Sequence, residues 1–406
     1  MTVPRRRPAK SPRQTRRESL RASGRATVQN QFKPIDILVE IPNLGLADGY
    51  GQSARSIANM LIEISKEENL ILKVVNKRNL CKAIDRSEDF NIVKDYLINE
   101  NQIGSVNIAM RYSLPKLDRY GAKRLISMTM FESDIVPPSW IEALNASELV
   151  IVPTEWGNKV FSKSIKTDVT TIPLAVDKLY YHQKLDSELV PSTDKFRFIT
   201  VGNYFQPDRK RLLPLIEAFA SRFKQDDVEL YVKSSWTDKG SPFTIPIDEV
   251  CAKYDNVILD TQNVDTDKLI DIYCTAHAAL FPSLGEGFGL PHAESALLGR
   301  ALVIADNSSM TSLSEYMPWV AKVKCKSVPA DYTPQMIKNA GNWAECDMNK
   351  FMDECEKLYK FWKTDPKKYN EQIIGCHRDN KLRHYISHEN IKELFRIAIL
   401  SELKKV

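Results

Sequence analysis

The sequence lacks several features that would place it in a class directly. It has no run of ~18 apolar residues, so we expect no membrane-spanning helix. Its N-terminus has no apolar core of the signal-peptide kind. The seven cysteines are scattered without a C-x-x-C pair, which indicates neither a disulfide framework nor a zinc knuckle and favours a reducing compartment. We therefore expect a cytoplasmic protein, with attachment to a membrane surface left open.

The net charge of +5 hides an uneven distribution of charge along the chain. Residues 1–33 hold ten Lys or Arg and one Glu, whereas the remainder holds 47 basic and 51 acidic residues. Because residues 1–33 are rich in Arg, Ser and Pro and have little to bury, we expect a disordered tail. Three interpretations stay open: electrostatic contact with nucleic acid or an anionic membrane surface, an organelle-targeting presequence, or a solvated tail.

Apolar runs of strand length alternate with amphipathic stretches along the rest of the chain. The 406 residues suffice for roughly two to three domains, and a hydrophobic content of 43% supports sizeable cores. The alternation predicts an α/β fold. We expect strands at 35–41, 70–75, 106–110, 124–131, 148–152, 169–173, 196–201, 229–232, 257–259, 277–280 and 301–305. We expect one helix at about 53–65, one that ends at 146, and further helices at 157–164, 212–223, 267–275 and 348–406.

The most informative stretch is 281–294, which reads FPSLGEGFGLPHAE. It holds three glycines, at positions 285, 287 and 289, and Pro291 stands where a helix would begin. Glycine lets a backbone approach a ligand closely. A helix that starts here aims free N–H groups and a positive dipole end at the loop, which suits an anion such as a phosphate.

Two carboxylates lie eight positions apart in this stretch. Glu286 belongs to the loop and Glu294 to the first helical turns. Carboxylates accept well from paired hydroxyls, so one of them could hold a sugar ring and the other a ribose. The alternative is an ordinary strand–loop–helix corner in which Glu294 only favours the helix N-terminus.

The stretch resembles the E-x7-E signature of retaining glycosyltransferases with the two-Rossmann (GT-B) fold. It is most similar to glycosyltransferase family 4, whose usual form is P-S-x-x-E-G-F-G-L-x-x-x-E-A, and Ser295 replaces the final Ala. The run 131–177 also resembles family segments, namely F-E-S-x-x-x-P-x-x-W, A-x-x-V-x-V-P-S-E-W and I-P-x-x-V-D. The matching residues of the signature are Pro282, Ser283, Glu286, Gly287, Phe288, Gly289, Leu290 and Glu294.

This resemblance implies an α/β fold of two Rossmann-like domains facing across a cleft. It implies an acceptor-side domain at 34–190 and a nucleotide-sugar donor domain at 191–365, after the basic tail at 1–33. Helices at 366–406 are expected to cross back and pack on the N-terminal domain.

The family also suggests how the donor diphosphate is held. The stretch 208–211 (DRKR) precedes a helix, where three consecutive cations oppose the helix dipole and indicate a bound anion. Arg209 and Lys210 match a family R-K-G element that supplies a lysine to the diphosphate. Arg211 stands in place of the glycine, and Asn203 in place of a frequent arginine. Either Arg209 or Arg211 substitutes for that arginine, or the diphosphate is held less tightly.

The resemblance extends to further site residues. It implies that Glu286 binds the sugar, Glu294 the ribose, and that Gly287, Phe288, Gly289 and Leu290 also contact the donor. Gly45, Gly49 and Gly51 resemble an N-terminal loop over the donor phosphate, and Asn263 and Val264 a loop that reads the base. Many relatives place a histidine at the sugar's reactive face, but all six histidines here lie at 182 or beyond. Glu132 stands at a comparable strand end, with a surface acid as the alternative, and we interpret His292 as structural.

The reaction implied is retaining transfer from a UDP- or GDP-sugar to an acceptor hydroxyl, of a glycan or a lipid-linked glycan. No D-x-D motif stands at a strand end, so we expect no divalent metal and no other cofactor. Alternatives are a transferase that uses the basic tail to act on modified nucleic acid, a non-catalytic nucleotide-sugar-binding protein, and an epimerase or phosphorylase of the same fold. The oligomeric state stays open.

Overall fold

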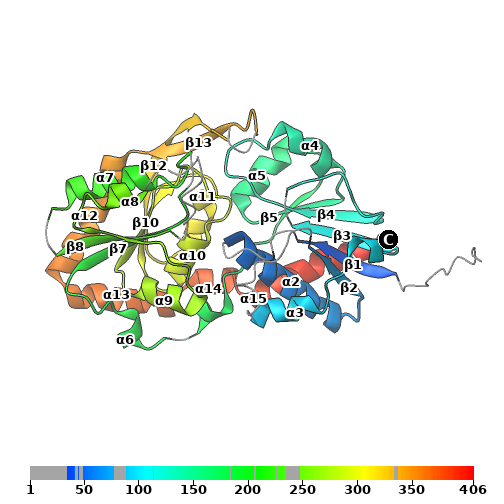
Figure 1. Cartoon of the computed structure of the whole chain (residues 1–406), viewed down its shortest axis with the longest axis horizontal. Coiled ribbons are helices and arrows are strands. Elements are labelled where there is room, and N and C mark those ends of the chain that lie inside the picture. Colours follow the sequence, from blue (N-terminus) through cyan, green and yellow to red (C-terminus); the bar gives the residue numbers. More distant parts are fainter. Residues whose placement is uncertain are drawn as a thin grey trace, which may run out of the picture.

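The computed structural model describes residues 34–41, 44, 49–76, 88–112, 114–182, 184–204, 207–224, 227–234, 247–332 and 337–406. The basic segment 1–33, on which the predicted anionic partner depends, lies outside the described residues, and so does Gly45. Within the described part, the chain forms two sheets that lie side by side, each with helices on both faces (Figure 1).

The first sheet has six strands among the described residues, all parallel, in the order β2-β1-β3-β4-β5-β6. Strand β1, which lies between β2 and β3, reads IDILVE and is buried along almost its whole length. Such apolar runs are typical of parallel strands covered on both faces. The bounds are β1 (Ile35–Glu40), β2 (Leu72–Val75), β3 (Val106–Tyr112), β4 (Arg124–Met128), β5 (Leu149–Val152) and β6 (Val169–Thr171).

The second sheet has seven strands among the described residues, in the order β13-β12-β11-β10-β7-β8-β9. All its pairs are parallel except the antiparallel pair of β12 and β13 at one edge. The bounds are β7 (Phe196–Val201), β8 (Val228–Lys233), β9 (Val257–Asp260), β10 (Ala278–Phe281), β11 (Ala301–Asp306), β12 (Val320–Pro329) and β13 (Asn342–Cys346).

Helices fill the crossovers between the parallel strands and bury an apolar stripe against each sheet. The α-helices are α2 (Gly49–Glu67), α3 (Glu88–Lys94), α4 (Pro138–Asn145), α5 (Glu155–Ser164), α6 (Asp186–Leu189), α7 (Leu212–Arg222), α8 (Ile247–Cys251), α9 (Thr266–Cys274), α10 (Leu290–Leu297), α11 (Met310–Leu313), α12 (Met348–Thr364), α13 (Pro366–Arg378), α14 (Lys381–Tyr385) and α15 (His388–Leu403). Short 3₁₀ turns are η2 (Glu100–Gln102), η3 (Lys178–Tyr181) and η4 (Ser314–Tyr316).

The C-terminal helices cross from the second domain back to the first, as predicted (Figure 1), but the return to the first domain comes with α15 and not already at residue 366, the expected boundary. Helices α12 and α13 pack on the second domain, whereas α15 packs on α2 and β3 of the first. Ile391, Phe395 and Ile399 recur every four residues on α15 and are fully buried, which gives the helix one apolar face. Beside this face, Lys392 lies 2.9 Å from Glu67 of α2.

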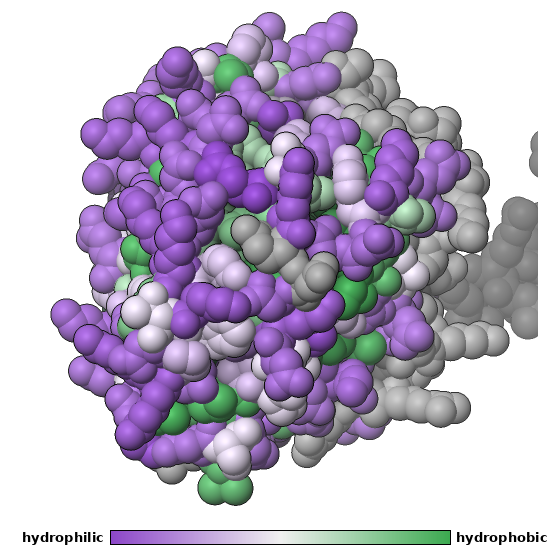
Figure 2. All heavy atoms as spheres, turned by 90° about the vertical axis from the view of Figure 1, so that its left-hand side faces the viewer, coloured by the Kyte–Doolittle hydropathy of each residue, from purple (hydrophilic) through white to green (hydrophobic). Residues whose placement is uncertain are grey.

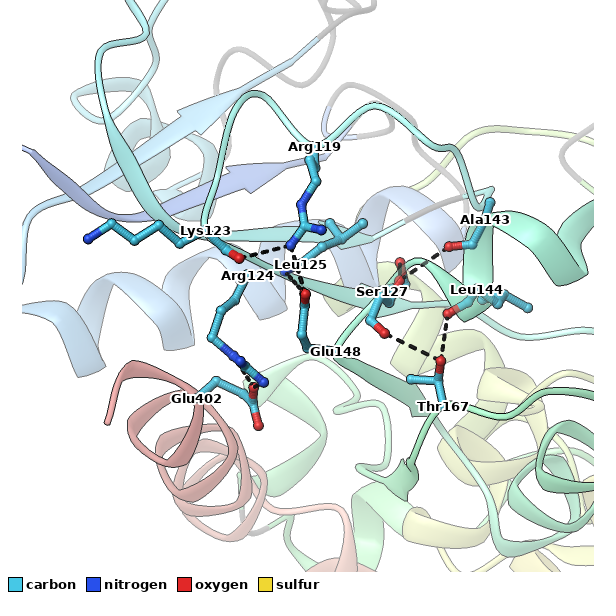
Figure 3. A network of polar contacts seen from close by, with 11 residues as sticks. Arg119, Lys123, Arg124, Leu125, Ser127, Ala143, Leu144, Glu148, Thr167 and Glu402 are labelled. Atoms are coloured by element: carbon cyan, nitrogen blue, oxygen red, sulfur yellow. Dashed lines mark hydrogen bonds and ion pairs between the residues drawn. The ribbon is translucent and has the colours of Figure 1, made fainter. Parts of the chain in front are cut away.

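A polar network fixes the end of α15 under the first sheet (Figure 3). Arg124 at the start of β4 points at Glu402 of α15, with Nε and Oε2 2.5 Å apart. Close by, Glu148 accepts two bonds of 2.9 Å from Arg119 and one from the Leu125 amide. The last helix is therefore held by charge pairs as well as by apolar burial.

Two features differ from the sequence-based expectation. Helix α2 begins at Gly49, so Gly49 and Gly51 lie in its first turn and not in a loop before it. Strands β12 and β13 were not predicted. Together with the described residues between them they form an extension, 320–332 and 337–346, which we call the β12–β13 arm.

The outer face of the second domain is mostly hydrophilic where its residues are described, and its hydrophobic residues form small separate patches (Figure 2). None of the helices in the described part of the chain has both the length and the hydrophobicity that spanning a bilayer requires.

Candidate active site

The motif loop joins β10 to α10 at the carboxyl edge of the second sheet. Gly289 takes φ 94° as the residue that caps α10, a backbone conformation that favours glycine. Pro291 lies in the first turn of the helix, where its missing N–H costs nothing. The strand, glycine loop and helix start predicted for this stretch are confirmed.

This loop rests directly on the end of β4 in the first domain. A Cβ atom at Gly285 would clash with the carbonyl oxygen of Glu132. A Cβ at Gly287 would lie 2.8 Å from Sδ of Met130. Glycine at these positions therefore lets the two domains come into backbone contact, with Glu132 at the point of closest approach.

Four charged side chains meet at this contact. Lys210 Nζ donates to Glu286 Oε1 at 2.6 Å. Arg209 lies between two carboxylates, 3.5 Å from Glu286 Oε2 and 3.4 Å from Glu132 Oε1, and it also donates to the carbonyl of Gly285. The structure thus brings together the four residues that the sequence predicted as catalytic.

The surroundings set the ionisation of this cluster. Glu286 is 4% exposed; burial would raise its pKa, but Lys210 and Arg209 hold the pKa well below its usual range. Burial lowers the pKa of Lys210 despite the nearby Glu286 carboxylate. Burial would also lower the pKa of Arg209, but Glu132 and Glu286 raise it above its ordinary value. At neutral pH Glu286 therefore carries a full negative charge between two cations.

The three consecutive cations before α7 do not require an external anion, contrary to our expectation from the helix dipole. Arg209 and Lys210 pair with the carboxylates just described, and Arg211 pairs with Glu345 on β13. Arg211 itself takes φ 58° as the cap of α7. The cations are satisfied by carboxylates that come from distant parts of the chain, which local sequence does not reveal.

Glu294, the second acid of the motif, lies apart from this cluster. It is 3% exposed and accepts a hydrogen bond of 2.9 Å from the Tyr273 hydroxyl. Burial raises its pKa to about 7, although the hydrogen bond from Tyr273 acts in the opposite direction. Burial and the nearby Glu294 carboxyl together raise the pKa of the neighbouring Tyr180 hydroxyl.

The loop after β11 holds the motif backbone in place. Ser308 Oγ accepts from the Glu286 amide at 2.8 Å, and Ser309 Oγ donates to the Gly287 carbonyl at 2.7 Å. Asn307 Nδ2 donates to the Ser283 carbonyl at 2.8 Å. The sequence analysis singled out no residue of this loop. The signal available was a polar N-S-S run directly after a buried strand.

The remaining predicted residues are placed unevenly around the centre. The stem of Lys210 passes 3.7 Å from a Cβ built on Gly202, next to half-buried Asn203. Leu290 and Phe288 are buried in the main core, and Leu290 Cδ1 lies 3.1 Å from a Cβ built on Gly49. Gly49 therefore lies next to the motif, and its contact with the donor stays a prediction.

Asn263 and Val264 follow β9, the edge strand that lies two strands from β7 in the second sheet. Asn263 is exposed and Val264 packs against the main core. Beside them, buried Lys233 donates to the Gln262 carbonyl, a contact that the sequence did not predict. Gly51 is buried within α2.

Comparisons with known proteins bear on this site. Residues 195–320, from the second domain's first strand to the start of the β12–β13 arm, match the family model described as "Glycosyl transferases group 1". No curated protein matches the chain.

Solved structures match over most of the chain. Sucrose-phosphate synthase from Thermosynechococcus elongatus matches with a TM-score of 0.63 and 14% identity, over 91% of this chain and 100% of its own. HepE from Anabaena, solved with UDP and glucose, matches with 0.60 and 12%, over 90% and 100%. A glycosyltransferase from Rickettsia africae matches with 0.59 and 13%, over 92% and 100%. The fold is GT-B. Together with the family match, this supports a GT-B glycosyltransferase.

Proposed function

We propose that this protein is a retaining glycosyltransferase of the family 4 type, which moves a sugar from a UDP- or GDP-sugar to an acceptor hydroxyl of a glycan or lipid-linked glycan. The observation that carries the proposal is the buried cluster of Glu286, Lys210 and Arg209 beside the N-terminal end of α10. It offers two cations to a leaving diphosphate and a carboxylate to sugar hydroxyls within one contact network.

Lys210 and Arg209 are suited to stabilising the departing diphosphate. They are fixed by Glu286 and Glu132 before any ligand arrives, and preorganised charges cost no reorganisation during the reaction. Donor binding would exchange part of these pairings for phosphate oxygens. Glu286 would then accept bonds from sugar hydroxyls, for which an ionised carboxylate is the stronger acceptor.

Glu294 is the candidate for the ribose. The phenol groups of Tyr273 and Tyr180 beside it support this role, because they add hydroxyls to the carboxyl in a buried site where ribose hydroxyls would need partners. Tyr180 lies on η3, which packs against α10, so η3 has to shift to admit a ribose. The base would lie along the loop with Asn263 and Val264.

Charge neutralisation by protein cations makes a divalent metal unnecessary in this proposal. Among the described residues, no three His, Cys, Asp or Glu side chains converge as a metal site requires. The expectation that no metal is used stays a prediction. Its test is transfer activity in the presence of EDTA compared with activity in added Mg²⁺ or Mn²⁺.

The deciding experiment is calorimetric titration with UDP, GDP, ADP and their common sugar conjugates, on the wild type and on Glu294→Ala. We expect one nucleotide to bind best and the substitution to weaken it. A labelled form of that donor then identifies the acceptor, and the anomeric configuration of the product by NMR tests retention. If no nucleotide binds, the proposed glycosyltransferase function is contradicted.

A further inference from the structure

The β12–β13 arm lies almost entirely beyond the segment that matches the family model, and it joins the two domains. The Tyr332 ring stacks on Phe131 of the first domain, with ring centroids 4.7 Å apart. The Ser133 hydroxyl donates to the Ala340 carbonyl, and Asp134 Oδ1 accepts from the Asn342 amide at 2.6 Å. The arm is therefore packed and hydrogen-bonded onto the segment that follows β4.

A cavity of about 190 Å³ lies where the arm meets the cleft. Its walls come from both domains, and the side chains that matter here are Glu132, Asp134, Trp156, Asp306, Asn342 and Trp343. Trp156 belongs to the first turn of α5 and Asp306 to the end of β11. Without the arm this cavity would lose Asn342 and Trp343 and would open to solvent.

The lining has the chemistry of a saccharide site. An indole offers a flat apolar surface to the C–H face of a pyranose ring, while carboxylate and amide groups take up its hydroxyls. Trp343 is fixed by a bond of 2.9 Å from its ring nitrogen to the Tyr332 hydroxyl, and Trp156 is half-buried. The volume is below the ~300–1,000 Å³ of sites for drug-sized ligands and suits a single sugar ring.

The charge of the lining selects against anions. Glu132, Asp134 and Asp306 contribute three carboxylates, of which Glu132 lies 3.4 Å from Arg209 and Asp306 lies 3.9 Å from Lys322. Bringing a phosphate into such a lining juxtaposes like charges, which suppresses the wrong partner. A ring that carries only hydroxyls meets no such penalty.

Glu132 connects the cavity to the reactive centre. Its carboxylate lines the cavity, accepts a hydrogen bond from Tyr332 at 3.2 Å, and lies 3.4 Å from Arg209. Arg209 in turn contacts Glu286, the residue proposed to hold the transferred sugar. A sugar ring in the cavity would therefore lie beside Glu132, with a hydroxyl facing the proposed site of the donor sugar.

We propose that this cavity is the acceptor subsite and that it receives an uncharged pyranose ring, which Trp156 holds by stacking and Glu132, Asp134 and Asp306 by hydrogen bonds, while the buried Trp343 forms part of the wall. The proposal rests on the proposed glycosyltransferase function for its meaning. It assigns acceptor specificity to the β12–β13 arm together with the first turn of α5.

Direct binding tests the subsite without turnover. The full chain, saturated with UDP or GDP, is titrated with the methyl glycosides of glucose, galactose, mannose and N-acetylglucosamine and with the matching 6-phosphates, and saturation-transfer NMR follows binding. We expect at least one uncharged glycoside to bind and its 6-phosphate to bind more weakly. Trp156→Ala should weaken glycoside binding about tenfold, with nucleotide binding unchanged.

Matched variants separate the site from general loss of folding. Trp362→Ala removes another half-buried indole, in the aromatic cluster around Phe196, and should leave glycoside binding unchanged. Asp306→Asn should reduce the difference in affinity between a glycoside and its 6-phosphate. Asp353→Asn on α12 should leave this difference unchanged.

Three results would overturn the subsite: no glycoside binding while a nucleotide binds normally, equal glycoside binding by wild type and Trp156→Ala, or tighter binding of the 6-phosphates. Loss of nucleotide binding in the wild type is a separate result. It contradicts the proposed function, and the glycoside titration without nucleotide still decides whether the cavity takes a sugar.

Discussion

Glu286 and Glu294 belong to the same fourteen-residue stretch and are almost equally buried, yet their surroundings shift their pKa values in opposite directions. Around Glu286 lie two cations, which keep the carboxylate ionised. Around Glu294, burial raises the pKa to about 7, because the neutral phenol groups beside it lower the pKa too little to offset the burial. Burial alone thus does not fix the state of a carboxyl group; the charge of the partner that shares its site decides it.

The difference matters for function because the two acids can do different work at neutral pH. An ionised Glu286 accepts hydrogen bonds only, so it suits substrate hydroxyls. A carboxyl that titrates near neutrality both donates and accepts. The two regions can be perturbed separately, and each perturbation has its own readout.

The largest effect is expected from Glu286→Gln. It leaves the half-buried Lys210 and Arg209 with one anionic partner fewer, so we expect a loss of stability below the about 3–5 kcal/mol that breaking a fully buried pair costs. It also removes the proposed sugar acceptor, so kcat should fall about 10²–10³-fold. Urea unfolding and steady-state kinetics measure the two effects.

A matched control for this substitution is Glu229→Gln, at the amino end of the same sheet. Glu229 is buried and lies 2.6 Å from Arg197, its neighbour across β7 and β8. The Glu229→Gln variant should be less stable than the wild type, but its folded form should keep the wild-type kcat. An equal fall of kcat in both variants would mean that Glu286 acts only through folding.

The next largest effect is expected from Lys210→Ala on donor binding. A hydrogen bond to a charged group contributes about 1.5–3 kcal/mol, which corresponds to a loss of roughly 10–100-fold in Kd. Arg211→Ala should change Kd little, because its guanidinium pairs with Glu345. Calorimetry with the preferred nucleoside diphosphate compares them, and a greater loss in Arg211→Ala would assign the diphosphate to Arg211.

Glu294→Gln should change how stability depends on pH. A carboxyl whose pKa is raised on folding contributes stability below its ordinary pKa of 4.5, and this contribution is lost as pH rises through about 7. A shift of this size corresponds to at most about 3 kcal/mol. Between pH 4.5 and pH 8, the free energy of unfolding measured with urea should decrease less in the variant than in the wild type. Identical decreases would place the raised pKa elsewhere.

The smallest effect is expected from Tyr273→Phe. It removes the one hydrogen bond that lowers the Glu294 pKa most, so the pKa should rise further above 7. Loss of a single hydrogen bond costs about 1 kcal/mol of stability. The side-chain carboxyl signal of labelled glutamate, followed by NMR across pH, measures the midpoint. A midpoint that moves to lower pH would contradict the assignment.

The sequence predicted the parallel strands and the motif corner because both depend on local pattern. Runs such as 301–305 are apolar throughout, and a glycine loop followed by Pro291 can hardly be read as anything but a helix start. The second-domain strands from β7 to β11 and the return of the C-terminal helices follow from such signals and from the family resemblance.

What local pattern did not reveal depends on distant partners. The pairing of Arg209 with Glu132 joins residues 77 positions apart across two domains, and Arg211 with Glu345 joins residues still further apart. The β12–β13 arm alternates lysines with Val323 and Cys325, a strand pattern that we did not assign. Its role becomes visible only where Tyr332 meets Phe131.

The contact between Gly285 and the Glu132 carbonyl has a mechanical consequence. The motif loop touches the first domain through backbone atoms, so the width of the cleft at this point is set by the absence of a single methyl group. An alanine at 285 would act as a wedge between the domains. It would leave every charged group of the cluster in place and change only how closely the two domains can approach each other. Such a variant therefore distinguishes ligand binding in the cleft from closure of the cleft.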